Sequence, residues 1–277
     1  MSRIQSPSSI NLYISCPRKY YYCYIDKQPS KPSIYLVRGK IAHSVLEDFF
    51  NGPVLENYKD QLFERIKRLF QFHWDKNQNE LNKLDLNEKE LRFYHFETEM
   101  MLVNWLSLFF QKMEQQINNG LSVQEAFQKL TPQREVWFSS DKYQVQGYID
   151  AIETSNGVRL MDYKTSKKYD MTDEYKLQLS IYALLYQEKL GQLPDRVGLY
   201  FLKGGEKDIP VDIDLVNQAK QIINEVHEKT KTDDIHAYLQ NITPLCKWST
   251  GQCDFYHLCF NKEKIKNNFD EVQRTLI

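Results

Sequence analysis

The segment from residue 134 to residue 165 constrains the fold of this chain more than any other stretch. It reads REVWFSSDKYQVQGYIDAIETSNGVRLMDYKT, three short apolar or alternating runs separated by Ser140-Asp141 and by Ser155-Asn156-Gly157. Runs of this length between turn-forming residues are typical of β-strands. We therefore predict a strand, a turn, a second strand, a second turn and a third strand.

Helical patterns lie on both sides of these strands. Pro7 begins a short helix that Pro17 stops, and GKIAHSVLEDFFN predicts a second helix that carries His43. Apolar residues recur at helical spacing over residues 56–74, 87–117, 172–190 and 215–230. The run RVGLYFL, residues 196–202, predicts one more strand. Strands with intervening helices indicate an α/β core, preceded here by a mostly helical region.

The bulk composition sets further limits. Hydrophobic residues make up 42% and charged residues 26% of the chain, which is ordinary for a soluble globular protein. No apolar run approaches the roughly 18 residues of a membrane span, and MSRIQSPSSI lacks a signal-peptide core, so we expect a cytoplasmic protein. Lys and Arg total 36 against 37 Asp and Glu, so no global basic field points to nucleic acid. A local basic groove needs only a few cations.

The third predicted strand places an acid and a lysine side by side. Alternation along GVRLMDYK puts Leu160, Asp162 and Lys164 on one face and the intervening residues on the other. The preceding strand ends in GYID, so an antiparallel hairpin through the Ser-Asn-Gly turn would bring Asp150 close to Asp162. Two close carboxylates repel each other unless a cation sits between them.

Oxygen ligands of this kind suit Mg²⁺ or Mn²⁺, which bind through one or two carboxylates, waters and phosphate oxygens. A lysine beside such a site can position a water and offset charge that develops on a phosphate. The spacing alone also fits two unrelated surface acids and a solvated lysine. A second match, Glu174-Tyr175-Lys176, lies in a polar stretch with no strand before it.

Four motifs together resemble a known family. GYIDAIETSNGVRLMDYKT followed by LQLSIYALLY resembles the RecB-like branch of the PD-(D/E)xK nuclease superfamily, in which a G-x-[IV]-D strand precedes an apolar strand ending in [DE]-[YF]-K-[TS], and a Q-x-x-x-Y helix follows. Upstream, SPSSINLYISCPRKYYYCYI resembles the opening C-P motif of that branch, and RGKIAHSVLEDFF resembles its G-x-x-x-H-x-x-L-E helix. The motifs occur in the family's order and span residues 6 to 186.

The resemblance implies an α/β fold with a restriction-endonuclease-like core, a mixed central sheet flanked by helices. It implies that His43, Asp150 and Asp162 bind Mg²⁺ or Mn²⁺ and that Lys164 is the catalytic lysine. Gln178 and Tyr182 match the Q-x-x-x-Y pair, which lines the site and helps to hold substrate. Glu135 sits where related chains often have a glutamate, and its role is left open. Glu47 is as compatible with a solvated helix face as with a place beside the site.

The same resemblance implies one nuclease domain over residues 1–277. Within it we expect N-terminal helices with Cys16 and His43, a helical insertion, a catalytic α/β core and a C-terminal cysteine-bearing segment, over residues 1–50, 51–130, 131–240 and 241–277.

Five cysteines, Cys16, Cys23, Cys246, Cys253 and Cys259, indicate metal ligation or buried thiols in a reducing compartment. The family resemblance implies a [4Fe–4S] cluster held by Cys16, Cys246, Cys253 and Cys259, acting as a structural staple between the chain ends. Cys246 departs from the closer spacing expected before the next cysteine, so Cys23 is an alternative fourth ligand. Buried free thiols and a zinc site that includes His257 are the cluster-free alternatives.

The function implied is that of a metal-dependent DNA exonuclease, similar to CRISPR-associated, phage and archaeal RecB-like exonucleases, acting on single strands or free ends in repair, recombination or CRISPR spacer acquisition. The chain has no G-x-x-x-x-G-K-[ST] motif, so unwinding would come from a helicase partner, and CRISPR adaptation proteins are the other candidate partners. The alternative is a non-cutting iron–sulfur DNA-binding or scaffold subunit. An iron–sulfur redox protein is disfavoured, because ferredoxin C-x2-C-x2-C spacing is absent.

Overall fold

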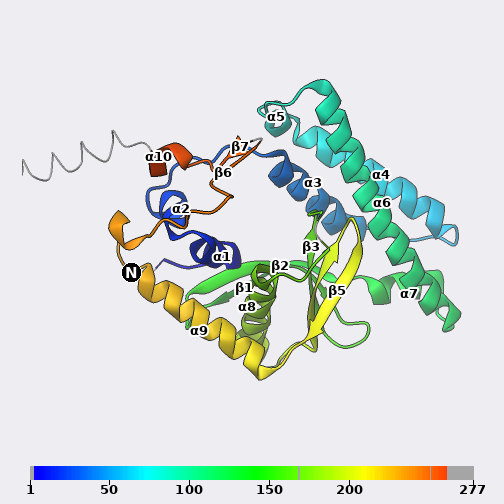
Figure 1. The fold of residues 1–277 in the computed structure, drawn as a ribbon. Helices are drawn as coiled ribbons and strands as arrows, with labels where there is room; N and C mark the ends of the chain where they lie inside the picture. The colour runs from blue at the N-terminus through cyan, green and yellow to red at the C-terminus, as the bar shows by residue number, and fades with distance from the viewer. Residues whose placement is uncertain (1–2, 168, 250, 261–277) are drawn as a thin grey trace, which may run out of the picture. The chain divides into compact units, whose positions relative to one another are not determined.

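The computed structural model describes residues 3–167, 169–249 and 251–260. The chain divides into two compact units (Figure 1). The sheet unit comprises the described residues of Ser2–Pro7 and Pro32–Glu225, and the cysteine unit comprises those of Ser8–Lys31 and Val226–Ile277. The boundary falls inside helix α9, Ile213–Lys229. Among the helices of the described ranges, none is long and apolar enough to cross a membrane.

A five-stranded mixed sheet forms the centre of the sheet unit. Its strands lie in chain order: β1 Gln133–Ser140, β2 Val145–Glu153, β3 Arg159–Lys164, β4 Arg196–Phe201 and β5 Gly205–Pro210. β3 and β4 run parallel, and the other neighbouring pairs are antiparallel. The predicted α/β class with a mixed central sheet flanked by helices is confirmed.

The turn between β2 and β3 sets the register on which the site depends. Gly157 adopts a φ of 75°, and a Cβ added there would lie 2.8 Å from a carboxylate oxygen of Asp195, so the turn needs glycine. Beyond the turn Ala151 pairs with Met161. One step further along, this register places Asp150 across from Asp162.

Helix α8, Asp173–Leu190, connects β3 to the parallel strand β4 and packs against β1 to β4. The Thr172 side chain caps its N-terminus by accepting from Tyr175 N, and Gly191 ends it with a φ of 73°. Because α8 follows β3 directly, Gln178 and Tyr182 on this helix can reach the side chains of β3 that face it.

The opposite face of the sheet carries the helical region. Helices α3 Ile34–Phe49, α4 Tyr58–Lys76, α5 Gln78–Leu81, α6 Glu88–Asn118 and α7 Val123–Leu130 make up this region, clustered beside the sheet in Figure 1. Its buried side chains share one core with Met161, Tyr163 and Tyr200 of the sheet. Odd-numbered residues of β3 thus face α3 and α6, while Asp162 and Lys164 face α8, as alternation predicts.

Three elements of the sheet unit were not predicted from the sequence: the four-residue helix α5, strand β5 and helix α7. β5 reads GEKDIP and lacks apolar alternation; Glu206 and Asp208 of this edge strand instead form ion pairs with Arg159. Helix α7 carries a readable signal, a capping box between Ser122 and Glu125 in the stretch SVQE. Its eight residues fell between two stronger patterns.

The cysteine unit joins two segments far apart in sequence. It contains α1 Pro7–Ser15, except Pro7 itself, α2 Pro17–Tyr20, a π-helical turn Tyr21–Ile25, a 3₁₀ turn Ile235–Ala237, β6 Lys247–Trp248, β7 Gly251–Gln252 and α10 Tyr256–Phe260. Arg18 Nε donates to Tyr238 O over 2.7 Å, and the Tyr22 hydroxyl donates to Leu258 O over 3.3 Å. Stacked rings of Tyr20 and Tyr238 form its core.

Candidate active site

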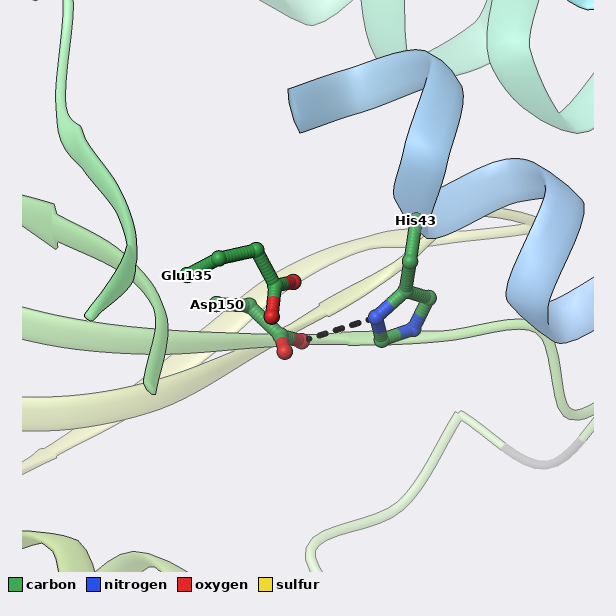
Figure 2. Close-up of side chains that lie close together, drawn as sticks. All are labelled: His43, Glu135 and Asp150. Carbon is green, nitrogen blue, oxygen red and sulfur yellow. Dashed lines mark ion pairs between the residues drawn. The ribbon is translucent and has the colours of Figure 1, made fainter. Parts of the chain in front are cut away.

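Three potential metal ligands meet where α3 approaches β1 and β2. His43 lies on α3, Glu135 on β1 and Asp150 on β2, and their side chains point toward one another (Figure 2). One ligand atom of each lies within 4.8 Å of the other two. His43 Nδ1 is 3.3 Å from Asp150 Oδ2. Within residues 3–167, 169–249 and 251–260, no other group of three such side chains is as compact.

The backbone of β3 orients His43. Its Nε2 lies 2.9 Å from Tyr163 O, and because a carbonyl oxygen only accepts hydrogen bonds, Nε2 carries a proton. Nδ1 is thereby directed at Asp150, an arrangement typical of metal-ligating histidines. Burial by itself would lower the pKa of His43, but the neighbouring carboxylates, Asp150 above all, raise it to about 9. The metal-free site therefore holds an extra proton at neutral pH.

Glu135 occupies an unusual backbone position. Its φ is 48°, in the left-handed region that residues other than glycine seldom adopt. By the register of β1 and β2 it lies opposite Asp150. Burial, followed by the charge of Asp150, raises the pKa of Glu135 to about 7. Backbone strain of about 1–3 kcal/mol persists where the surrounding structure enforces it, and such positions cluster at functional sites.

A second set of side chains surrounds Asp162 on the α8 face. Lys164 Nζ is 2.6 Å from Asp162 Oδ2. Gln178 contacts both members of this pair, because its Oε1 accepts from Lys164 Nζ over 2.9 Å and its Nε2 donates to Asp162 Oδ1 over 2.7 Å. The Tyr182 hydroxyl adds a hydrogen bond to Asp162 Oδ1 over 3.2 Å. The amide of Gln178 therefore holds the acid and the lysine in one fixed arrangement.

Burial governs the electrostatics of this pair. Burial raises the pKa of Asp162, the cation of Lys164 opposes that shift, and Asp150 adds to it. Burial would lower the pKa of Lys164, but Asp162 beside it makes the net shift upward. Lys164 is therefore a stable ammonium group, whose charge and protons are available to the site.

The backbone of Tyr163 links the two sets. This residue stands between Asp162 and Lys164, its N–H donates to Asp150 Oδ2 over 2.7 Å, and its carbonyl accepts from His43. One peptide segment of β3 thus fixes His43 and Asp150 on one side and presents Asp162 and Lys164 on the other. The D-Y-K spacing of the sequence accounts for both contacts.

A depression of about 420 Å³ opens onto the first set. It is lined by Tyr35, Leu36, Gly39, Lys40, His43, Ser44, Glu47, Glu135 and Asp150. Four of the lining residues come from one stripe of α3, at positions 36, 40, 43 and 47. Exposed Glu47 thus belongs to the wall of the depression. The opening gives a substrate access to His43 and the two carboxylates.

The structure distributes the site residues predicted from the sequence over these two sets. His43 and Asp150 lie together, and Asp162, Lys164, Gln178 and Tyr182 lie together on the other side of the Tyr163 backbone. The compact group of three contains Glu135, whose role the sequence left open, in place of Asp162. The strained backbone and the cross-strand position that bring Glu135 there have no signature in a single sequence.

Four of the five cysteines line one small cavity within the cysteine unit. The cavity has a volume of about 30 Å³ and is lined by Cys16, Cys246, Cys253 and Cys259, but not by Cys23. All five thiols are half-buried and free of disulfides. Burial raises the pKa of Cys259, and the neighbouring thiol of Cys16 adds to this.

Comparison with known proteins places this geometry in a family. Residues 5–260 match the sequence profile of the PD-(D/E)XK nuclease superfamily. The Gene 69 proteins of Mycobacterium phages D29 and L5 are each 26% identical to this chain, over alignments that cover 92% of it and 96% of the phage proteins. A crystal structure described as that of a "putative exonuclease" from Eubacterium rectale superimposes with a TM-score of 0.53 and 11% identity, covering 94% of this chain and 93% of the other. The profile match extends over nearly the whole described chain, and the chain therefore belongs to the PD-(D/E)XK nuclease superfamily.

Proposed function

We propose that the protein is an Mg²⁺- or Mn²⁺-dependent deoxyribonuclease that removes nucleotides from free ends of single-stranded DNA. The observation that carries this proposal is the joint position of the His43, Glu135 and Asp150 group and the Asp162–Lys164 pair, fixed to each other by the backbone of Tyr163. A structural ion pair alone would not need three further ligands beside it.

The residues present fit a divalent cation. Carboxylate oxygens and one imidazole nitrogen suit Mg²⁺ and Mn²⁺. Oδ2 of Asp162 is buried and its one ion-pair partner among the described residues is the Lys164 ammonium, 2.6 Å away, and a carboxylate oxygen has a second lone pair with which to bind a cation. His43, Asp150 and Asp162 would hold the ion, and Glu135 would join them. The bound cation would supply polarisation of the scissile phosphate and a lowered pKa for the attacking water.

Lys164 would act on the reacting groups directly. Its ammonium is held by Asp162 and Gln178 and remains protonated. It would donate a hydrogen bond to the attacking water, orienting that water, and would offset the negative charge that develops on the phosphate. Asp162 and Gln178 would hold Lys164 in position for this step.

The preference for free ends and single strands rests on two supports. The sequence motifs resemble those of RecB-like exonucleases, and the Eubacterium rectale protein of similar fold carries the name "putative exonuclease". Unwinding by a helicase partner, or work beside CRISPR adaptation proteins, belongs to the same proposal. Repair, recombination and CRISPR spacer acquisition are the processes in which such an activity is used.

We further propose that Cys16, Cys246, Cys253 and Cys259 hold a [4Fe–4S] cluster in a reducing cytoplasm. These four cysteines share one cavity in the cysteine unit, and Cys23 is not in its lining, which favours Cys246 as the fourth ligand. Binding to iron would convert the thiol of Cys259, whose pKa is raised, to a thiolate. The cluster would clamp two segments that are far apart in sequence.

The spacing of the thiols favours a cluster over a single zinc ion. With Zn–S bonds of about 2.3 Å, the sulfurs of a tetrahedral zinc site lie less than about 4 Å apart. Among the described side chains, no three cysteine sulfurs lie within 4.8 Å of one another. A four-iron cluster separates its thiolates more widely than one zinc ion does.

The test is digestion of end-labelled linear and circular single strands by protein purified without oxygen. The proposal predicts that linear strands lose end nucleotides in Mn²⁺, that circles survive, and that EDTA stops the reaction. Cutting of circles would show an endonuclease instead. Strong DNA binding with no cutting in Mn²⁺ or Mg²⁺ would support the non-cutting scaffold subunit.

A further inference from the structure

An exposed pair of aromatic side chains stands beside the metal-ligand group on the same hairpin. Trp137 of β1 and Tyr148 of β2 pair across the strands, with ring centroids 4.7 Å apart. Trp137 is 39% exposed and Tyr148 is 53% exposed. The neighbouring residues Phe138 and Ile149 are buried and pack into the core, so the exposed rings are not needed there.

Each ring of this pair lies two residues from one of the carboxylates on the same strand. Glu135 and Trp137 are two residues apart on β1, and Asp150 and Tyr148 are two residues apart on β2. Two residues of a strand cover about 7 Å. Tyr148 is exposed, whereas Asp150, two residues further along β2, is buried. The rings therefore lie at the exposed end of the hairpin segment whose other end carries the two carboxylates.

We propose that Trp137 and Tyr148 form a stacking platform for unpaired bases of the strand whose phosphate enters the metal site. The inference rests on the proposed nuclease function and deepens it, because only a strand with unpaired bases offers open ring faces for stacking. Aromatic side chains of this kind bind bases with little regard to sequence.

Charge beside the platform favours a nucleic-acid strand over an apolar partner. Lys40 lines the depression that opens onto His43, Glu135 and Asp150. Glu135 and Asp150 require a cation of their own, and a bound cation attracts phosphate. The phosphate backbone of a strand can contact this cation and Lys40 while its bases lie on the rings.

A cross-strand aromatic pair also stabilises its hairpin, but that role uses the contact between the rings and leaves their outer faces unused. Replacement by leucine separates the two roles, since leucine keeps an apolar side chain on the strand but offers no ring. Replacement by phenylalanine keeps a ring in both positions. Phe72 of α4, which is 58% exposed in the same unit, provides a matched control.

The experiment measures binding of short single-stranded oligodeoxynucleotides that carry one abasic residue at successive positions from the end. It uses full-length Asp162→Asn protein in Mn²⁺, so that binding is read without cleavage. One or two adjacent abasic positions should weaken binding by about 5-fold to 150-fold, the range for loss of a stacked base. In Trp137→Leu and Tyr148→Leu, binding of the intact strand should fall similarly, and those abasic positions should no longer matter.

Trp137→Phe and Tyr148→Phe should keep most of the affinity, and Phe72→Ala should keep all of it. Leucine variants that bind the intact strand as tightly as the parent, or a loss not confined to particular abasic positions, would overturn the platform. Cleavage by the otherwise unaltered protein is scored separately. Position-dependent stacking without any cleavage would refute the hydrolytic function alone, and cleavage without stacking would refute the platform alone.

Discussion

The sheet unit and the cysteine unit hold their candidate metal-binding residues in different ways. In the sheet unit, Asp150 and Asp162 are placed by strand register, and hydrogen bonds from Tyr163 and Gln178 fix their carboxylates. In the cysteine unit, the thiols come from a residue between α1 and α2, from residues flanking the two-residue strands β6 and β7, and from the five-residue helix α10.

We infer from this difference that the site in the sheet unit is formed before metal binds, whereas the site in the cysteine unit depends on its metal. Long strands and a buried core maintain the first site with or without an ion. A two-stranded hairpin as short as β6–β7 has little stability of its own. We therefore expect loss of metal from the sheet unit to abolish chemistry while the fold remains, and loss of the cluster to reduce stability first.

The largest effect on the sheet-unit site is expected for Asp162→Asn. It keeps the shape of the side chain but removes the charge that a cation and Lys164 both need. Cleavage should fall by about 10²- to 10⁴-fold in a single-turnover assay, with little change in the melting temperature. Glu174→Gln, in the exposed second D/E-x-K match on α8, serves as control and should keep full activity. Turnover by Asp162→Asn at the rate of the unaltered protein would show that Asp162 is not an active-site residue.

Replacement of a cluster ligand tests whether the cysteine unit depends on its cluster for stability. Cys16→Ser, Cys253→Ser and Cys259→Ser should each lose the brown colour of anaerobically purified protein. They should also lose up to about 5 kcal/mol of stability, by analogy with a covalent link that closes a very long loop. The main effect should be on the free energy of unfolding, and the rate of cleavage should change less, because the two sites share no ligand.

Visible absorption, iron and sulfide analysis and thermal melts measure these changes. Cys23→Ser is the matched control and should keep its colour. If Cys23→Ser loses the colour while Cys246→Ser retains it, the fourth ligand is Cys23. Colourless protein with stoichiometric zinc would contradict the cluster and leave the nuclease site unaffected.

A smaller effect is expected for Gln178→Leu. Without the amide, the Asp162–Lys164 pair loses the group that orients both of its members. Turnover should drop by about 10- to 100-fold, the usual range for a residue that supports metal ligands, while the KM for DNA changes little. Gln187→Leu, on the same helix, provides a control away from the pair. A rise in KM with unchanged turnover would assign Gln178 to substrate binding instead.

The mildest perturbation is a change of one pH unit. The pKa of His43 is about 9 in the metal-free protein, so below that pH a bound cation must displace a proton. Mn²⁺ affinity should rise about tenfold per pH unit toward pH 9, and more steeply below about 7, where Glu135 also holds a proton. Electron paramagnetic resonance of free Mn²⁺ measures this. Glu135→Gln should remove only the steeper part, and an affinity independent of pH would contradict ligation by His43.

The sequence carried much of this account. The D-Y-K strand, the Ser-Asn-Gly turn and the Q-x-x-x-Y helix suffice to bring Asp150, Asp162 and Gln178 into one region, because period and turn chemistry are local properties. The polar strand β5 was missed, since its pairing depends on Lys112 and Arg159 from distant segments. Glu135 and the ring pair of Trp137 and Tyr148 depend on cross-strand register, which a single sequence does not display.

The most direct test of the central claim compares Lys164→Met with Lys176→Met. Both changes remove one lysine charge, but Lys164 lies in the proposed site and Lys176 is exposed on α8, 3.6 Å from Asp173. Release of nucleotides from an end-labelled single strand in Mn²⁺ is the measurement. We predict that Lys176→Met digests the strand like the unaltered protein and that Lys164→Met releases no nucleotides, although it still binds Mn²⁺. Undiminished release by Lys164→Met would show that the chemistry takes place elsewhere.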